Sequence, residues 1–251
     1  MTLSIHQWHQ RYQQQARWTQ NLRKYVYERV DIRTAKRILD VGCGTGVLLG
    51  ELRRISSGSL FGLDIDFNSI SIVQQSILKS ILIHGDALRL PFHSGSFDVS
   101  LCHFLLLWVK NPLQVLHEMR RVTHDGGYIL ALAEPDYGGR IDFPDKLSQI
   151  GHWQIEALID QGANPVIGRE LRSLFSECEL KNIEVGILGG QWGEEWGDDD
   201  FELEWEVILS DLHNKNEFME SANEYKSLEL DSREKHQRIL YVPTFYALGE
   251  V

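Results

Sequence analysis

Short apolar runs alternate with amphipathic helical patterns between residues 36 and 133. Each apolar run has the length of a buried strand, and each segment between two runs repeats apolar residues at helical spacing. Strands that alternate with helices in this way predict a parallel sheet with right-handed crossovers. The predicted strands are Arg37–Val41, Ser59–Asp64, Ile81–Gly85, Phe97–Cys102 and Tyr128–Ala133, and the predicted helices are Val47–Ile55, Asn68–Lys79 and Leu113–Arg121.

The flanking segments continue with helical and strand patterns. The first thirty residues repeat apolar side chains at helical spacing and predict one or two amphipathic helices. After Glu134 we expect a loop, then helices and further strands. The loop is predicted at Pro135–Asp145, the helices at Lys146–Gln161 and Arg169–Cys178, and the strands at Asn182–Leu188 and Ile239–Leu248.

Short polar signals mark two element boundaries. Asn111 is a preferred helix N-cap, and the proline that follows it favours the first helical turn. The sequence Asp-Gly-Gly at residues 125–127 predicts a turn before the fifth strand. Both signals agree with the predicted order of elements.

Negative charge is concentrated in one segment. The chain has a formal net charge of −11, and the segment Trp192–Lys235 holds 15 acidic and 4 basic residues, which accounts for the whole excess. Apolar residues of this segment fall on one helical face, so we expect a folded insertion rather than a disordered tail. Binding to nucleic acid needs a basic face. We therefore expect no nucleic-acid partner, and a small or cationic substrate fits better.

Composition indicates an ordinary globular protein. The 251 residues are 43% hydrophobic and 24% charged, and the first twenty show neither a signal peptide nor a membrane-spanning start. The three cysteines are far apart and form no CxxC pair, which argues against a zinc site and suits a reducing compartment. We expect one domain, residues 1–251, in the cytoplasm, with no metal and no membrane partner.

The clearest chemical signal is the loop after the first predicted strand. Residues 38–46 pass from a buried-strand pattern into three alternating glycines, Gly42, Gly44 and Gly46. Such glycines permit positive φ and let a nucleotide-like ligand approach the backbone. The spacing is GxGxG rather than the GxGxxG that seats a pyrophosphate. Asp40 would repel a pyrophosphate but suits the ammonium and sulfonium groups of S-adenosyl-L-methionine.

This loop resembles that of the class I S-adenosylmethionine-dependent methyltransferases, and the resemblance extends over residues 36–133. Within that family the chain is similar to the ubiquinone/menaquinone-type and natural-product small-molecule methyltransferases. The resemblance implies an α/β fold, with a Rossmann-like, doubly wound and mostly parallel seven-stranded sheet. The expected strand order is 3-2-1-4-5-7-6 with the last strand antiparallel, N-terminal helices, and a helical acidic insertion before the last strand.

Further motifs of the resemblance imply contacts with the cofactor. Asp64 would hold both ribose hydroxyls with its two acceptor oxygens, Asp86 would accept the adenine amine, and His103 would touch the methionine part. Asp64 and Asp86 also have a structural interpretation as turn residues, and His103 as a histidine that is either hydrogen-bonded within the protein or on the surface. The implied cofactor-binding residues are Asp40, Gly42, Cys43, Gly44, Gly46, Asp64, Ile65, Asp86, Ala87 and His103.

A general base is optional for this chemistry. Transfer from a sulfonium is an in-line displacement that depends mainly on alignment and exclusion of water. An oxygen nucleophile would benefit from a base, for which His103 and Glu134 are the candidates. Glu134 and Tyr137 follow the fifth strand, where the loop of similar enzymes reaches the substrate mouth. His152 is a third candidate base, but it fits a surface position better.

Other polar residues have mainly structural interpretations. Asp66 fits a helix N-cap, and Asp98 at a strand start is expected to be structural. Arg11 and Arg17 are either partners of the cofactor carboxylate or solvated helix charges. The pair Gln191-Trp192 either lines an aromatic pocket or packs in the core.

The domain is expected to have three parts: an N-terminal helical cap at 1–32, a cofactor-binding core at 36–134, and an acidic helical insertion or lid at 192–238. Two alternatives to a methyltransferase of small molecules remain. One is a non-catalytic protein that binds or senses S-adenosylmethionine, and the other is an NAD-dependent oxidoreductase. The acceptor, the methylated atom and the oligomeric state stay open.

Overall fold

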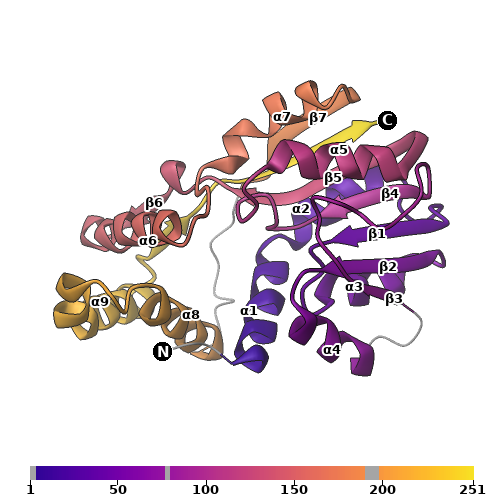
Figure 1. Ribbon diagram of the computed structural model, residues 1–251. Coiled ribbons are helices and arrows are strands. Elements are labelled where there is room, and N and C mark those ends of the chain that lie inside the picture. Colours follow the sequence, from indigo (N-terminus) through magenta and orange to yellow (C-terminus); the bar gives the residue numbers. More distant parts are fainter. Residues whose placement is uncertain (1–3, 77–79, 190–197) are drawn as a thin grey trace.

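Seven strands form one sheet in the order β3-β2-β1-β4-β5-β9-β7 in the computed structural model, which describes residues 4–76, 80–189 and 198–251 (Figure 1). Neighbouring strands from β3 to β5 are parallel, and β9 runs antiparallel between β5 and β7. This confirms the predicted order, with the last strand between the fifth and the sixth. The strands are β1 (Arg37–Val41), β2 (Ser59–Asp64), β3 (Ile81–His84), β4 (Phe97–Cys102), β5 (Thr123–Pro135), β7 (Lys181–Ile187) and β9 (Thr244–Glu250).

Helices cover both faces of the sheet. Consecutive residues of β1 alternate between two apolar clusters, with Ile38 in one and Leu39 in the other. Strands buried on both faces give continuous apolar runs, which is the pattern seen in the sequence. The helices are α1 (Ile5–Trp18), α2 (Gln20–Arg29), α3 (Val47–Ile55), α4 (Phe67–Ser76), α5 (Pro112–Val122), α6 (Ser148–Asp160), α7 (Leu171–Glu177), α8 (Asp198–Asp211) and α9 (Asn216–Glu234), with 3-10 turns η1 (Tyr137–Gly139), η2 (Asp145–Leu147) and η3 (Ile167–Glu170).

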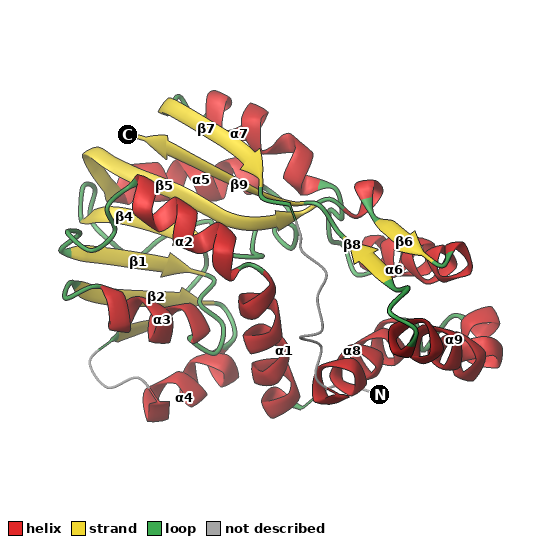
Figure 2. Ribbon diagram, turned by 180° about the vertical axis from the view of Figure 1, so that it is seen from behind, coloured by secondary structure: helices red, strands yellow, loops and turns green. Residues whose placement is uncertain are grey.

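Helices α6, α8 and α9 form a separate group, here called the helical unit. Its own apolar cluster is centred on Trp153 of α6, Trp205 of α8 and Phe218 of α9. The unit faces the carboxyl ends of the parallel strands, and α1 lies between it and the sheet (Figure 1, Figure 2). The acidic segment is thus folded in its described part, as its helical periodicity predicted. No helix within the described ranges is long and apolar enough to cross a membrane.

The turn predicted at residues 125–127 was wrong, because β5 already begins at Thr123. Gly126 adopts a φ of 79°, so the strand bends there without ending. The last residue, Val251, holds this bend: its N–H donates to Gly127 O at 3.0 Å, and its carbonyl oxygen accepts from Gly126 N at 3.1 Å. Contacts with Val251, which is distant in the sequence, therefore determine the conformation here rather than the local turn residues.

The strand predicted at Ile239–Leu248 is two strands. β8 (Ile239–Tyr241) pairs with β6 (Ile141–Phe143) in a small second sheet, whereas β9 joins the main sheet. Pro243 lies between β8 and β9 and has no N–H to donate, which ends the ladder. β6 also lies inside the segment predicted as a loop. The N-cap predicted at Asn111 is confirmed, since its side chain accepts from Gln114 N at 3.0 Å.

Candidate active site

The glycine-rich loop joins β1 to α3 and lies at the carboxyl edge of the sheet. Gly42 and Gly44 adopt positive φ, 74° and 49°. A Cβ at Gly42 would lie 2.8 Å from Leu105 Cδ1, and a Cβ at Gly44 would lie 3.1 Å from the Tyr12 ring. Both positions therefore need glycine for conformation and for space. Leu63 O accepts from Gly42 N at 2.7 Å, which holds the loop against β2.

Two carboxylates stand beside this loop. Asp40 is only 2% exposed, and its carboxylate has no hydrogen-bond partner among the described residues. Burial, and then the nearby Asp64, raise the pKa of Asp40 to about 8. Asp64 accepts from Gly44 N at 2.7 Å and from Asp66 N at 2.9 Å. A buried carboxylate without a partner is costly, and a bound cation would offset that cost.

A cavity of about 450 Å³ opens above the loop. Its near wall is the glycine loop with Asp40, Asp64 and the segment after β4. One side is α1, through residues such as Trp8 and Tyr12, and the far wall comes from η1, α6 and α8. The cavity thus lies between the sheet and the helical unit, where ligands bind in open α/β sheets.

His103 follows β4 and lines this cavity. Its Nε2 lies 2.9 Å from the hydroxyl oxygen of Thr19. Burial, and then the positive charge of Arg23, lower the pKa of His103 well below its ordinary value. The imidazole is therefore neutral near pH 7, as a hydrogen-bond acceptor or base must be.

Glu134 does not line the cavity. It lies within β5 and is fully buried, and its carboxylate accepts from the backbone N–H groups of Leu105, Leu106 and Leu107 at 3.1, 3.0 and 3.2 Å. Burial outweighs these bonds and raises its pKa to about 7. The expected position at a substrate mouth is not what the structure shows. Glu134 instead shapes the loop that brings Leu105 against Gly42.

The residues predicted for the adenosine end lie outside the cavity. Ile65 is 69% exposed, and Asp86 is exposed and accepts from Leu88 N at 2.9 Å. Ala87 is buried beside it. All three follow β2 or β3, so they adjoin Asp64 along the same edge of the sheet. The cofactor residues predicted from the sequence therefore form one edge that runs from the cavity to the surface.

The remaining candidates divide into cavity residues and structural residues. Arg11 and Tyr137 line the cavity, whereas Arg17 is exposed and pairs with Asp200. Asp66 is the expected N-cap of α4 and accepts from Asn68 N and Ser69 N. Asp98 accepts from the backbone N–H groups of Lys36 and Arg37, and His152 is exposed. The pair Gln191-Trp192 lies outside the described residues.

Sequence reasoning named Arg11 as a possible cofactor partner but missed the other residues of α1 that line the cavity. Trp8, Tyr12 and Gln15 all face the cavity, and burial with the charges of Asp64 and Asp66 raises the pKa of Tyr12 to about 12. Their spacing is that of any packed helix face. The sequence offered one indication of a cavity here, which is that Trp8 and Tyr12 lie one turn apart on a helix that precedes the glycine loop.

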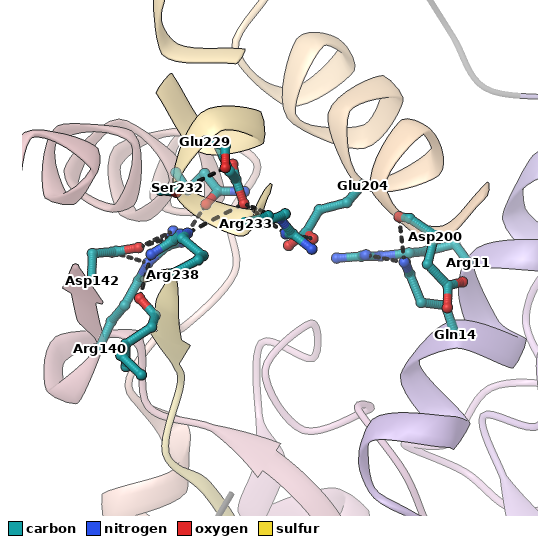
Figure 3. Close-up of polar contacts among 12 residues, drawn as sticks. Arg11, Gln14, Arg140, Asp142, Asp200, Glu204, Glu229, Ser232, Arg233 and Arg238 are labelled. Atoms are coloured by element: carbon teal, nitrogen blue, oxygen red, sulfur yellow. Dashed lines mark hydrogen bonds and ion pairs between the residues drawn. The ribbon is translucent and has the colours of Figure 1, made fainter. Parts of the chain in front are cut away.

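Buried ion pairs support the far side of the cavity (Figure 3). Asp142 of β6 accepts from Arg140 at 2.6 Å and from Arg238 at 2.7 Å. Glu229 of α9 accepts from Arg233 at 2.6 Å and from Arg238 at 3.3 Å. Arg233 also reaches Glu204 of α8 at 3.2 Å. The chain of pairs links β6 and α9 to α8, whose Val207 and Asp211 line the cavity.

Comparison with known proteins agrees with this geometry. Residues 39–131 match the methyltransferase domain family. The chain is 33% identical over 200 residues to a demethylmenaquinone methyltransferase of Bacillus velezensis, covering 71% of this chain and 84% of the relative. A similar relative from Bacillus mycoides is 30% identical over 185 residues, which cover 65% of this chain and 77% of the relative.

A solved structure shares the fold. Phosphoethanolamine N-methyltransferase 2 of Haemonchus contortus, in complex with S-adenosyl-L-methionine, matches with a TM-score of 0.56 at 15% identity, over 93% of this chain and 52% of that one. The glycine loop, the strand order and the relatives together favour a methyltransferase over an oxidoreductase. The chain belongs to the class I S-adenosylmethionine-dependent methyltransferases.

Proposed function

We propose that this enzyme methylates a small molecule held in the cavity between the glycine loop and the helical unit. The single observation that carries the proposal is the cavity itself, whose volume of about 450 Å³ lies in the range of small-molecule sites. Its walls come from the glycine loop, α1, α6 and α8, and a site of this size between such walls fits a small acceptor better than a folded protein or a nucleic acid. The methyl acceptor would meet the cofactor between the glycine loop and α1.

The residues at the glycine loop fit S-adenosylmethionine. The cofactor supplies an electrophilic methyl group on a sulfonium. Asp40 faces the cavity without a partner, which suits the cationic groups of the cofactor. Each oxygen of Asp64 holds one backbone N–H and retains a second acceptor site for a ribose hydroxyl.

The cofactor's adenosine end fits the open edge of the sheet. Asp86 is exposed there with Ala87 next to it, as a contact with the adenine edge requires. Ile65 offers an exposed apolar side chain after Asp64. Cys43 and Gly46 complete the loop beneath the methionine part.

The far wall favours a polar acceptor. Arg11, Tyr137, Gln161 and Asp211 contribute a cation, a hydroxyl, an amide and a carboxyl group to one side of the cavity. Burial raises the pKa of Tyr137 and of Asp211, which favours their neutral, hydrogen-bond-donating forms. The relatives are named for demethylmenaquinone, which makes it the first acceptor to test. A set of smaller polar metabolites is the informative comparison.

Calorimetry with S-adenosylmethionine and its demethylated product tests the site. We expect micromolar affinity in the wild type and at least a tenfold loss in Asp64→Ala, because charge-assisted hydrogen bonds contribute about 1.5–3 kcal/mol. Asp66→Ala is the matched control, since it removes a neighbouring carboxylate that caps α4. Equal affinity in wild type and Asp64→Ala would overturn the assignment. Transfer of labelled methyl to a metabolite, and to no added protein or RNA, tests the acceptor class.

The arrangement also suggests how the parts of the domain cooperate. The N-terminal helices at 1–32 and the insertion at 192–238 would cover the acceptor, while 36–134 would hold the cofactor. The described chain carries three buried, free cysteines, Cys43, Cys102 and Cys178. Unpaired thiols suit the reducing cytoplasm, which is the location we propose.

A further inference from the structure

The hydroxyl of Thr19 lies at the centre of a buried hydrogen-bond cluster behind the cavity wall. Thr19 joins α1 to α2 and is 5% exposed. Its Oγ1 lies 2.9 Å from Gln15 O, 2.6 Å from Arg23 Nη1 and 2.9 Å from His103 Nε2. Three groups of different chemistry thus meet at one oxygen.

The donors and acceptors at this oxygen can be assigned by elimination. A hydroxyl has one proton to donate and two lone pairs to accept with. Gln15 O is a carbonyl and can only accept, so it takes the threonine proton. Arg23 can only donate, so it uses one lone pair. His103 Nε2 must then donate to the second lone pair, which means that Nε2 carries a proton.

We propose that Thr19 and Arg23 hold His103 as the neutral Nε2–H tautomer, so that its Nδ1 lone pair accepts a hydrogen bond from a protic group of a molecule bound in the cavity. Nδ1 has no partner among the described residues, and the ring lines the cavity. Thr19 and Arg23 are positioning residues, because they act through the imidazole. This inference rests on the proposed function for the identity of the bound molecule, but the tautomer itself is a property of the free protein.

The charges around His103 favour its neutral form. Arg23 is 1% exposed and donates to both carboxylate oxygens of Glu51, at 3.0 and 2.5 Å. Asp40 on the neighbouring strand β1, Tyr27 on α2 and Cys102 next to His103 are further buried titratable groups. Asp40 is largely protonated near pH 7, and Tyr27 and Cys102 are neutral, since burial raises the pKa of all three. Burial of the imidazole is the main reason for its neutral form, and the positive charge of Arg23 acts in the same direction.

Two protic groups can reach the Nδ1 lone pair. One is the ammonium of the cofactor's methionine part, and the other is an O–H or N–H group of the methyl acceptor. Both offer the same chemistry, a hydrogen-bond donor. Ligands that differ in the ammonium distinguish them.

Nitrogen-15 NMR of the histidine side chains tests the tautomer directly. The chain has 10 histidines, and His103→Gln assigns the signal by its loss. We expect one protonated nitrogen, Nε2, and one lone-pair nitrogen, Nδ1, at about pH 7, because burial lowers the pKa of His103 well below its ordinary value. A protonated Nδ1, or an imidazolium at about pH 7, would overturn the proposal.

Thr19→Val and Thr19→Ser separate positioning from packing. Valine keeps the size of threonine but removes the acceptor, so the tautomers of His103 should mix; serine should restore the wild-type spectrum. Thermal unfolding shows whether each variant remains folded. A Thr19→Val variant that is folded and retains the wild-type tautomer would overturn the role of Thr19.

Binding and turnover then identify the donor. If it is the cofactor's ammonium, Thr19→Val weakens S-adenosylhomocysteine about fivefold to tenfold and leaves methylthioadenosine, which lacks the ammonium, unchanged. If it is the acceptor, both affinities are unchanged and kcat falls. Normal affinities with normal turnover would contradict the proposal. Because the NMR result needs no ligand, it stays interpretable even if the proposed acceptor class is wrong.

Discussion

Two groups of acidic residues differ in how the fold accommodates their charge. At the glycine loop, Asp40 has no hydrogen-bond partner within the described chain, and Asp64 accepts only from backbone amides. Beside the helical unit, Asp142 of β6 pairs with two arginines, and Glu229 of α9 does the same. Arginines of the fold therefore balance the second group. Among the described residues, neither Asp40 nor Asp64 forms an ion pair with an arginine or lysine, and we propose that cationic groups of the ligand balance them.

This difference distinguishes acidic residues of a binding site from acidic residues that stabilise the fold. Removing a carboxylate from water costs free energy, and a paired arginine or a bound cation offsets that cost. The helical unit has no continuous sheet to hold its parts together, and its ion pairs connect β6, α8 and α9 (Figure 3). A buried carboxylate that the fold leaves unpaired, such as Asp40, is therefore the stronger indication of a ligand.

Removing a paired acid should have the largest effect. Asp142→Ala leaves Arg140 and Arg238 buried without their carboxylate, so we expect a loss of about 3–5 kcal/mol in the free energy of unfolding. Urea unfolding followed by circular dichroism measures it. The control is Asp231→Ala, which breaks an exposed pair with Lys235 and should cost less than about 0.5 kcal/mol. Similar losses in the two variants would show that the buried ion pairs stabilise the fold no more than an exposed pair does.

Asp40 should make the free energy of unfolding depend on pH. The pKa of Asp40 is about 8 in the folded chain, against an ordinary value of 3.8, so the folded state binds the extra proton between these values. The free energy of unfolding therefore falls as pH rises through this window, by up to about 1.4 kcal/mol per pH unit. Asp40→Asn should remove this contribution.

Unfolding at about pH 5.5 and about pH 7.5 measures the difference. We expect wild type to lose up to about 3 kcal/mol relative to Asp40→Asn between the two values. Saturating S-adenosylmethionine should reduce the difference, because a bound cation favours the ionised carboxylate. Parallel pH curves for the two proteins would mean that the fold already balances Asp40.

Replacing an acid that is held by backbone amides should have the smallest effect on stability. Glu134→Gln replaces one acceptor oxygen by an amide that faces an N–H of the Leu105–Leu107 segment, and we expect a loss of about 1–2 kcal/mol. Calorimetric unfolding measures the stability. Affinity for S-adenosylmethionine should change little, since Glu134 lies outside the cavity. A loss of turnover at unchanged stability and affinity would instead restore Glu134 as a candidate base.

Prediction from sequence succeeded where local pattern and fold agree. The bounds of β1, β2 and β4 follow directly from their apolar runs. Asp40 and Asp64 both line the cavity, because parallel strands bring their carboxyl ends to one edge. Prediction failed where contacts between residues far apart in the sequence determine the structure. The bend in β5 depends on Val251, and the partners of Glu134 come from a loop that only the folded chain brings near.

The α1 helix shows why part of the site could not be predicted. Tyr12 and Thr19 repeat at the spacing of any buried helix face, which says that they are covered but not by what. Only the approach of α1 to the glycine loop reveals that Tyr12 meets Gly44 and that Thr19 meets His103. Packing residues and cavity residues have the same periodicity, so the pattern does not distinguish them.

The sequence by itself determined the alternation of strands and helices, the glycine loop and the acidic residues beside it, because periodicity and the requirement for positive φ are properties of neighbouring residues. The tertiary structure alone decided which buried charges are paired. Asp142 meets Arg238 only because β6 pairs with β8 across the chain, whereas no described residue brings a cation into contact with Asp40. Charge balance depends on distances through space, and these are set only when the elements pack.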